Sequence, residues 1–143
     1  MSQYTAAVPS DGLVRPEIKF FFEEFYKISD TADAHEKYAE TFTSDARLIM
    51  GPNEAKGRDE IIKMRHGMWE KVAQRSHKPE QIYAFGSGSD EVMLNGTVAY
   101  VLKDDKKTET VWAAKAHFVK LDGVLKMDFY QVFLDTGAMA RAK

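Results

Sequence analysis

The sequence contains no cysteine, and this absence excludes several kinds of chemistry. Without cysteine there is no disulfide framework, no thiolate nucleophile and no zinc site built on sulfur ligands. The formal net charge at pH 7 is only −2, so there is no strong basic field to attract phosphates, and we expect no nucleic-acid partner. The four histidines show no metal-ligand spacing. We therefore expect neither a metal site nor a cofactor.

Long apolar runs are also missing. The first fifteen residues have neither a basic start nor an apolar stretch, so they do not resemble a signal peptide or a membrane anchor. No segment approaches the roughly 20 apolar residues that a membrane-spanning helix needs. The sequence therefore predicts a cytosolic protein with no membrane partner.

The composition that is present fits one globular domain. The 143 residues are 44% hydrophobic and 29% charged, which is ordinary for a protein with a single core. Aromatic side chains make up 12% of the chain, enough to fill a core or to line a cavity. We expect residues 1–14 to form a mobile arm, residues 15–136 the domain and residues 137–143 a C-terminal tail.

The first half of the chain has the periodicity of helices. Apolar residues recur at three- and four-residue intervals after Pro16, a residue type that suits the first turn of a helix. The pattern predicts three helices, at about residues 16–28, 34–42 and 58–73, and one strand at residues 45–50.

The second half alternates between apolar and polar residues, which is typical of strands. The pattern predicts four strands, at about residues 77–85, 91–103, 108–120 and 124–135. Short segments rich in Gly, Asp, Ser and Lys separate them and have the composition of turns. Helices followed by a run of strands favour an α+β domain.

Asp122-Gly123 is a strong signal for a two-residue hairpin turn, and it predicts the register of the last two strands. If Leu121 pairs with Val124, each strand has one set of side chains on each face. One face carries Trp112, Ala114, Ala116, Phe118, Met127, Phe129, Gln131 and Phe133. The other carries Ala113, Lys115, His117, Asp128, Tyr130 and Val132. We expect the helices to cover the first face. The second is either an acid–base cluster or an ordinary solvated or dimer-facing surface.

The chain resembles the NTF2-like superfamily in the order of its elements and in three segments: Tyr38…Phe42…Asp45-Ala46, Gly57-Arg-Asp-Glu-Ile61 and Asp122-Gly123-Val-Leu-Lys-Met127. It looks most like the small fungal SnoaL-like members of that superfamily. The resemblance covers about residues 16–135. It implies a cone in which three N-terminal helices pack on a curved, mostly antiparallel sheet around an apolar pocket.

The resemblance to one enzyme of that superfamily, scytalone dehydratase, implies the position of a site. Asp30 and His77 are similar in position to a catalytic Asp and His of that enzyme. Several polar residues that the enzyme uses are replaced here by Ser29, Met50, Leu102, Trp112 and Ala114. The resemblance therefore implies an Asp–His pair in a more apolar pocket, and it argues against scytalone as the substrate.

The candidate functional residues each have a structural alternative. His77 is the candidate general acid or base, because imidazole titrates near neutrality; alternatively, it bonds to a loop at the start of a strand. Asp30 either orients His77 or caps the second helix. Arg65 either meets a buried partner or a ligand oxygen, or extends to the surface. The candidate ligand-binding residues are Tyr26, Met50, Arg65, Trp69, Tyr100, Trp112, Phe129 and Gln131.

Two functional hypotheses remain open. The first is a cofactor-independent isomerase, cyclase or dehydratase that acts on a small, largely apolar, oxygenated metabolite, such as one of secondary metabolism. In it, His77 moves a proton, Asp30 orients His77, and Gln131 and a tyrosine hold a carbonyl or hydroxyl group. The second is a non-catalytic module that binds a small molecule or forms a dimer. The sequence also predicts a homodimer through the sheet face that carries Lys115, His117, Asp128 and Tyr130.

Overall fold

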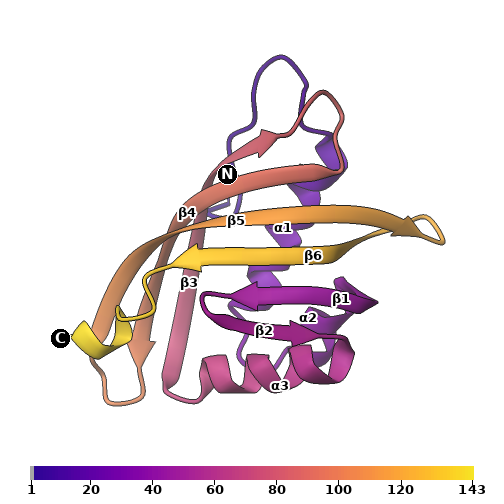
Figure 1. Ribbon diagram of the computed structural model, residues 1–143. Coiled ribbons are helices and arrows are strands. Elements are labelled where there is room, and N and C mark those ends of the chain that lie inside the picture. Colours follow the sequence, from indigo (N-terminus) through magenta and orange to yellow (C-terminus); the bar gives the residue numbers. More distant parts are fainter. Residues whose placement is uncertain (1) are drawn as a thin grey trace.

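Three helices lie on one side of a six-stranded sheet (Figure 1). The computed structural model describes residues 2–143. The helices are α1 (Pro16–Ser29), α2 (His35–Glu40) and α3 (Arg58–Trp69), followed by a final 3-10 turn, η1 (Met139–Arg141). The strands are β1 (Phe42–Met50), β2 (Asn53–Lys56), β3 (Val72–Ala84), β4 (Glu91–Leu102), β5 (Lys107–Leu121) and β6 (Val124–Leu134). The predicted α+β class is confirmed. Within residues 2–143, no helix is long and apolar enough to span a membrane.

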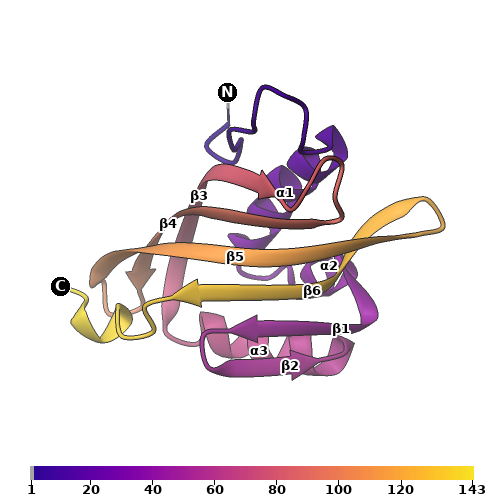
Figure 2. The same ribbon diagram turned by 45° about the horizontal axis from the view of Figure 1, so that its top comes forward.

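The sheet is mixed and strongly curved. Its strand order is β2-β1-β6-β5-β4-β3, and the β1–β6 pair is parallel whereas every other pair is antiparallel. The long strands β3, β4 and β5 bend along their length, as Figures 1 and 2 show from two directions. The sheet thereby forms a concave face, and α1 to α3 cover it.

A proline and a glycine mark a close approach between β3 and β4. Pro79 lies opposite Gly96, and the β3 register shifts between Pro79 and Gln81. Proline cannot donate a ladder hydrogen bond, so it suits such an irregularity. A Cβ atom on Gly96 would lie 2.3 Å from the backbone oxygen of Lys78 and 2.9 Å from Cζ2 of Trp112. Only glycine allows Trp112 to pack against β4 at this point.

The core joins α1 to the middle of the sheet. Phe22 and Phe25 of α1 are buried, as the helical periodicity predicts. The ring centroid of Phe22 lies 5.5 Å from that of Phe118 on β5, and the centroid of Phe25 lies 5.2 Å from that of Tyr130 on β6. Each such buried aromatic contributes roughly 1.5–3 kcal/mol through apolar burial. These contacts fix α1, and therefore its C-terminal end, against the sheet.

Three strands differ from the sequence-based expectation. Strand β1 begins at Phe42, which the pattern had placed in the second helix, and not at residue 45. Strand β2 was not predicted, because it has only four residues (Asn-Glu-Ala-Lys), of which only Ala55 is buried. Strand β3 begins at Val72 and not at residue 77, and α3 ends at Trp69 and not at residue 73. Val72 continued the apolar helical pattern, but it is buried as the first residue of a strand. The longer β3 brings Arg75 into the sheet.

A β-bulge makes part of the predicted register of the last hairpin wrong. Leu121 pairs with Val124 as predicted, and Asp122 and Gly123 have positive φ angles of 52° and 79°, which a type I′ turn requires. The register then shifts by one residue at Asp128. One extra residue on β6 exchanges the two faces for every later β6 residue. The helix-covered face therefore receives Tyr130 and Val132, whereas the outer face receives Phe129, Gln131 and Phe133.

Both ends of the described chain pack on the domain. The backbone nitrogen of Ala7 donates to the oxygen of Glu80 (2.8 Å), and the nitrogen of Ile82 donates to the oxygen of Ala7 (3.0 Å). At the other end, Lys107 and Lys143 exchange two backbone hydrogen bonds of 2.9 and 3.1 Å. The segment around Ala7 therefore lies against β3, whereas the sequence predicted a mobile arm over residues 1–14.

Candidate active site

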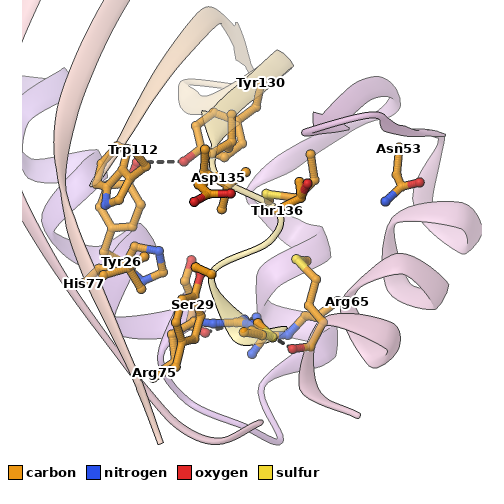
Figure 3. A pocket seen from close by; sticks show the side chains of 18 of the residues that line it. Tyr26, Ser29, Asn53, Arg65, Arg75, His77, Trp112, Tyr130, Asp135 and Thr136 are labelled. Carbon is orange, nitrogen blue, oxygen red and sulfur yellow. Dashed lines mark hydrogen bonds between the residues drawn. The ribbon is translucent and has the colours of Figure 1, made fainter. Parts of the chain in front are cut away.

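A cavity of about 190 Å³ lies between the concave face of the sheet and the helices. Its walls are mostly aromatic and aliphatic. Figure 3 shows Tyr26, His77 and Trp112 side by side on one part of the wall, with Tyr130 close to them. The C-terminal segment also contributes to the lining, through Asp135, Thr136, Ala138 and Met139. Two of these residues, Ala138 and Met139, belong to the segment that the sequence analysis assigned to a C-terminal tail.

His77 and Asp30 meet at the wall of this cavity. Asp30 follows the last residue of α1, and His77 lies on β3. Nδ1 of His77 lies 2.6 Å from Oδ1 of Asp30. The other carboxylate oxygen accepts a hydrogen bond from the backbone nitrogen of His77 (2.8 Å) and one from the hydroxyl of Tyr4 (2.8 Å). Because the Asp30 side chain is only 6% exposed, this carboxylate is held by protein donors.

The Asp30 contacts set the protonation state of the imidazole. A carboxylate beside Nδ1 favours the tautomer with the proton on Nδ1, which leaves the Nε2 lone pair free. Burial lowers the pKa of His77 below its usual value and the Arg75 cation acts in the same direction, whereas the hydrogen bond to Asp30 partly opposes them. The ring is therefore neutral at pH 7. A neutral imidazole with a free Nε2 is equipped to accept a proton.

Tyr26 and Tyr130 form a hydroxyl pair next to this imidazole. Their oxygens are 2.7 Å apart, and both side chains are buried. The Tyr26 ring centroid lies 4.9 Å from that of His77. Burial raises the pKa of both tyrosines, so both hydroxyls keep their protons. One hydroxyl donates its proton to the hydrogen bond between the two oxygens, and the proton of the other hydroxyl is available for a hydrogen bond to a ligand.

Arg65 is buried and fastens α3 to the end of α1. Its guanidinium donates to the backbone oxygens of Ser29 (3.3 Å), Ile28 (3.2 Å) and Thr31. It also lies over the ring of Tyr38, with 4.7 Å between Cζ and the ring centroid. A cation at the C-terminal end of a helix is favoured by the helix dipole. Arg65 therefore has a structural role here, and it holds the turn after α1 that carries Asp30.

Arg75 also lines the cavity, and the sequence patterns did not single it out. It lies two residues before His77 on the same face of β3. Its guanidinium carbon is 4.8 Å from the ring centroid of Trp69 and 5.4 Å from that of Tyr100. One nitrogen, Nη2, donates to the backbone oxygen of Met68 (2.7 Å). Extending the alternation of β3 back from His77 by two residues, to Arg75, was the signal that could have found it.

The chain is similar to solved structures at low sequence identity, although no protein-family model matches it and no curated protein is detectably similar to it. A hexachlorocyclohexane dehydrochlorinase, LinA type 2, gives a TM-score of 0.70 at 16% identity, over 85% of this chain and 84% of that chain. A candidate scytalone dehydratase from Novosphingobium aromaticivorans gives 0.68 at 20% identity, over 83% and 82%. An NTF2-like protein of unknown function from an Exiguobacterium species gives 0.67 at 12% identity, over 81% and 98%. This chain has the NTF2-like fold.

Within the NTF2-like fold, the structure brings most of the candidate residues together. His77 and Asp30 are in contact, and the cavity is lined by Tyr26, Met50, Arg65, Tyr100 and Trp112. Trp69 stacks against Arg75 from beneath the lining. Two candidates are misplaced: the bulge at Asp128 directs Phe129 and Gln131 to the outer face, so the prediction that they face the pocket is wrong. Tyr130, assigned from the sequence to the outer face, occupies the pocket wall instead.

Proposed function

We propose that the protein is a cofactor-independent lyase or isomerase that transfers a proton on a small, largely apolar, oxygenated substrate. Dehydration, isomerisation and cyclisation all belong to this class of acid–base reactions. The observation that carries the proposal is the contact between His77 and Asp30 at the wall of an apolar cavity, at 2.6 Å. Nδ1 is bound by a buried carboxylate, which leaves Nε2 as the nitrogen that a substrate can meet.

The geometry supports a two-step proton transfer. Nε2 of His77 removes a proton from a carbon next to a carbonyl group, and Asp30 stabilises the imidazolium that forms. A hydroxyl of the Tyr26–Tyr130 pair donates to the carbonyl oxygen, where negative charge develops. His77 then returns the proton, either to a leaving hydroxyl group, which departs as water, or to another carbon. Exclusion of bulk water from the cavity strengthens each of these polar contacts.

The names of two similar structures are compatible with this class of chemistry. The names of two similar structures, a dehydrochlorinase and a candidate scytalone dehydratase, both denote eliminations. With 16% and 20% identity, these similarities show a shared fold and not a shared activity. The argument for proton transfer therefore depends on the residues of this chain.

The competing function is a non-catalytic small-molecule-binding module. It is favoured by the apolar composition of much of the cavity wall, where Met50, Val98, Trp112 and Val132 offer a ligand few polar contacts. A binding module would use the same cavity without turnover. The two functions differ in what His77 does, and a measurement of proton exchange separates them.

The test follows deuterium exchange into 2-tetralone, a bicyclic aromatic ketone with acidic α-protons, by NMR in D₂O. The wild-type protein should accelerate exchange, and His77→Gln should reduce that acceleration by roughly 10²–10⁴-fold, the usual contribution of general acid–base catalysis. The matched control is His117→Gln. His117 also bonds to an aspartate, Asp128, at 2.7 Å, but the pair lies on the outer face of the sheet. His117→Gln should leave exchange unchanged, and absence of exchange in the wild type would favour the binding module.

A further inference from the structure

One cation at the cavity wall has fewer partners than its chemistry demands. Arg75 carries five N–H donors, yet among residues 2–143 only its Nη2 has an acceptor, the backbone oxygen of Met68. Within residues 2–143, no carboxylate lies within 4.0 Å of the guanidinium. Arg65, by comparison, donates to three backbone oxygens through Nη1 and Nη2, although its Nε is buried without an acceptor. Arg75 is therefore the cavity arginine with the larger number of donors that lack an acceptor.

Asp30, the carboxylate of the candidate site, is not the missing anionic partner of Arg75. Both oxygens of Asp30 already accept hydrogen bonds, from His77 and from Tyr4. Trp69 and Tyr100 contact the Arg75 guanidinium through their rings and fix its plane, but aromatic rings do not accept its N–H donors in the manner of an oxygen anion. Burial lowers the pKa of Arg75 below its usual value, as expected for a cation whose charge lacks an anionic partner.

We propose that the cavity selects a ligand with a carboxylate group and that Arg75 binds this carboxylate. A planar guanidinium packed against two rings matches the planar, two-oxygen geometry of a carboxylate. A phosphate dianion would call for more cationic donors than this mostly aromatic cavity supplies. The ligand is accordingly an aromatic or aliphatic acid whose apolar body lies against the cavity wall.

The position of Arg75 also restricts which carbon reacts, a step that depends on the function proposed above. Arg75 and His77 lie on the same face of β3, two residues apart. Two residues of a strand span roughly 6.5–7 Å. A carboxylate at Arg75 therefore places a carbon a few bonds along the ligand next to the imidazole. The substrate class becomes an apolar carboxylic acid that carries its acidic C–H a few bonds from the carboxylate.

Isothermal titration with trans-cinnamate and its neutral isostere trans-cinnamamide tests the inference. The wild-type protein should bind cinnamate about 10–100-fold more tightly, as a charge-assisted hydrogen bond provides. Arg75→Met should bind both probes equally. Arg47→Met is the matched control, because Arg47 is half-exposed and pairs with Glu54 away from the cavity. It should keep the full preference. Equal binding of both probes to the wild type, or no binding of cinnamate up to millimolar concentration, would overturn the proposal.

Three further arms make the result decisive. Arg75→Lys keeps the charge but loses the planar fork, so it should keep only part of the preference, and this variant decides the question if Arg75→Met does not fold. Inorganic phosphate should displace cinnamate no better than acetate does; stronger displacement by phosphate would overturn the carboxylate assignment. His77→Gln should retain the preference for cinnamate. Loss of the preference with proton exchange intact would refute only this inference, whereas loss of exchange with the preference intact would refute only the proposed function.

Discussion

Replacing Asp30 by asparagine tests whether this carboxylate sets the chemistry of His77. Two oxygens of Asp30 accept three hydrogen bonds, from the backbone nitrogen and Nδ1 of His77 and from the hydroxyl of Tyr4. Asparagine has nearly the same shape but presents one oxygen and one NH₂ group. At least one of the three donors then faces another donor. If the amide nitrogen faces His77, the ring must accept at Nδ1 and carry its proton on Nε2, which is the wrong tautomer for a base.

The cost to stability follows from burial. The Asp30 side chain is 6% exposed, so solvent does not replace the lost hydrogen bonds. A hydrogen bond to a charged group contributes roughly 1.5–3 kcal/mol, and we expect Asp30→Asn to destabilise the fold by about that amount. For a domain of this size, the melting temperature falls by about 5–10 °C. The control is Asp128→Asn in the exposed pair with His117, which should cost less than about 0.5 kcal/mol.

The same variant has a signed effect on pH dependence. In the wild type the pKa of His77 lies below its usual value of 6.5, so the unfolded state binds more protons than the folded state as pH falls below 6.5. Stability therefore decreases with falling pH in that window. Asp30 is the group that raises the pKa of His77, against burial and Arg75. Removing its charge should lower that pKa further and extend the loss of stability to lower pH.

The assay is nitrogen-detected NMR titration of His77 together with the 2-tetralone exchange rate. The wild type should show a proton on Nδ1, a pKa below 6.5 and an exchange rate that reaches its plateau by neutral pH, because the neutral ring is the base. Asp30→Asn should lower the pKa, change the tautomer and reduce the rate. A raised pKa of His77 in this variant, or full exchange activity with the altered tautomer, would refute the role given to Asp30.

Two other predictions concern packing and assembly. Gly96→Ala should destabilise the fold by roughly 1–3 kcal/mol in thermal melts, because its Cβ would lie 2.3 Å from the backbone oxygen of Lys78. The control, Gly67→Ala, should be neutral or stabilising, because no atom lies within 4 Å of the added carbon. Equal effects of the two substitutions on stability would contradict the argument. We also keep the prediction of a homodimer through the outer sheet face, which carries Lys115, His117, Asp128 and exposed Met93 and Phe133 but not Tyr130. Light scattering should give a dimer mass at micromolar concentration, Phe133→Lys should shift it toward monomer, and a monomeric wild type would contradict the prediction.

The sequence predicted the fold better than it predicted the site. Helical and alternating periodicities located α1, α3 and the long strands, and the Asp122-Gly123 turn was placed correctly. The bulge at Asp128 could not be predicted, because alternation alone carries no sign of one extra residue. That single residue exchanged Gln131 for Tyr130 in the pocket wall. Arg75 was missed for a related reason: the helix-like spacing of Val72 hid the start of β3.

The parallel pairing of β1 with β6 also has a consequence for how the chain folds. The β3–β4–β5 meander connects neighbouring segments, so its loops close at small entropic cost. Strand β1, by contrast, pairs with residues 127–132, which are synthesised about 80 residues later. During translation, β1 can pair with β2, but its other edge must wait without a partner until β6 has left the ribosome. We expect chains truncated before β6 to expose an unpaired strand edge and to aggregate, with no cavity formed, since Tyr130 lies on β6 and Asp135, Thr136, Ala138 and Met139 of the lining follow it.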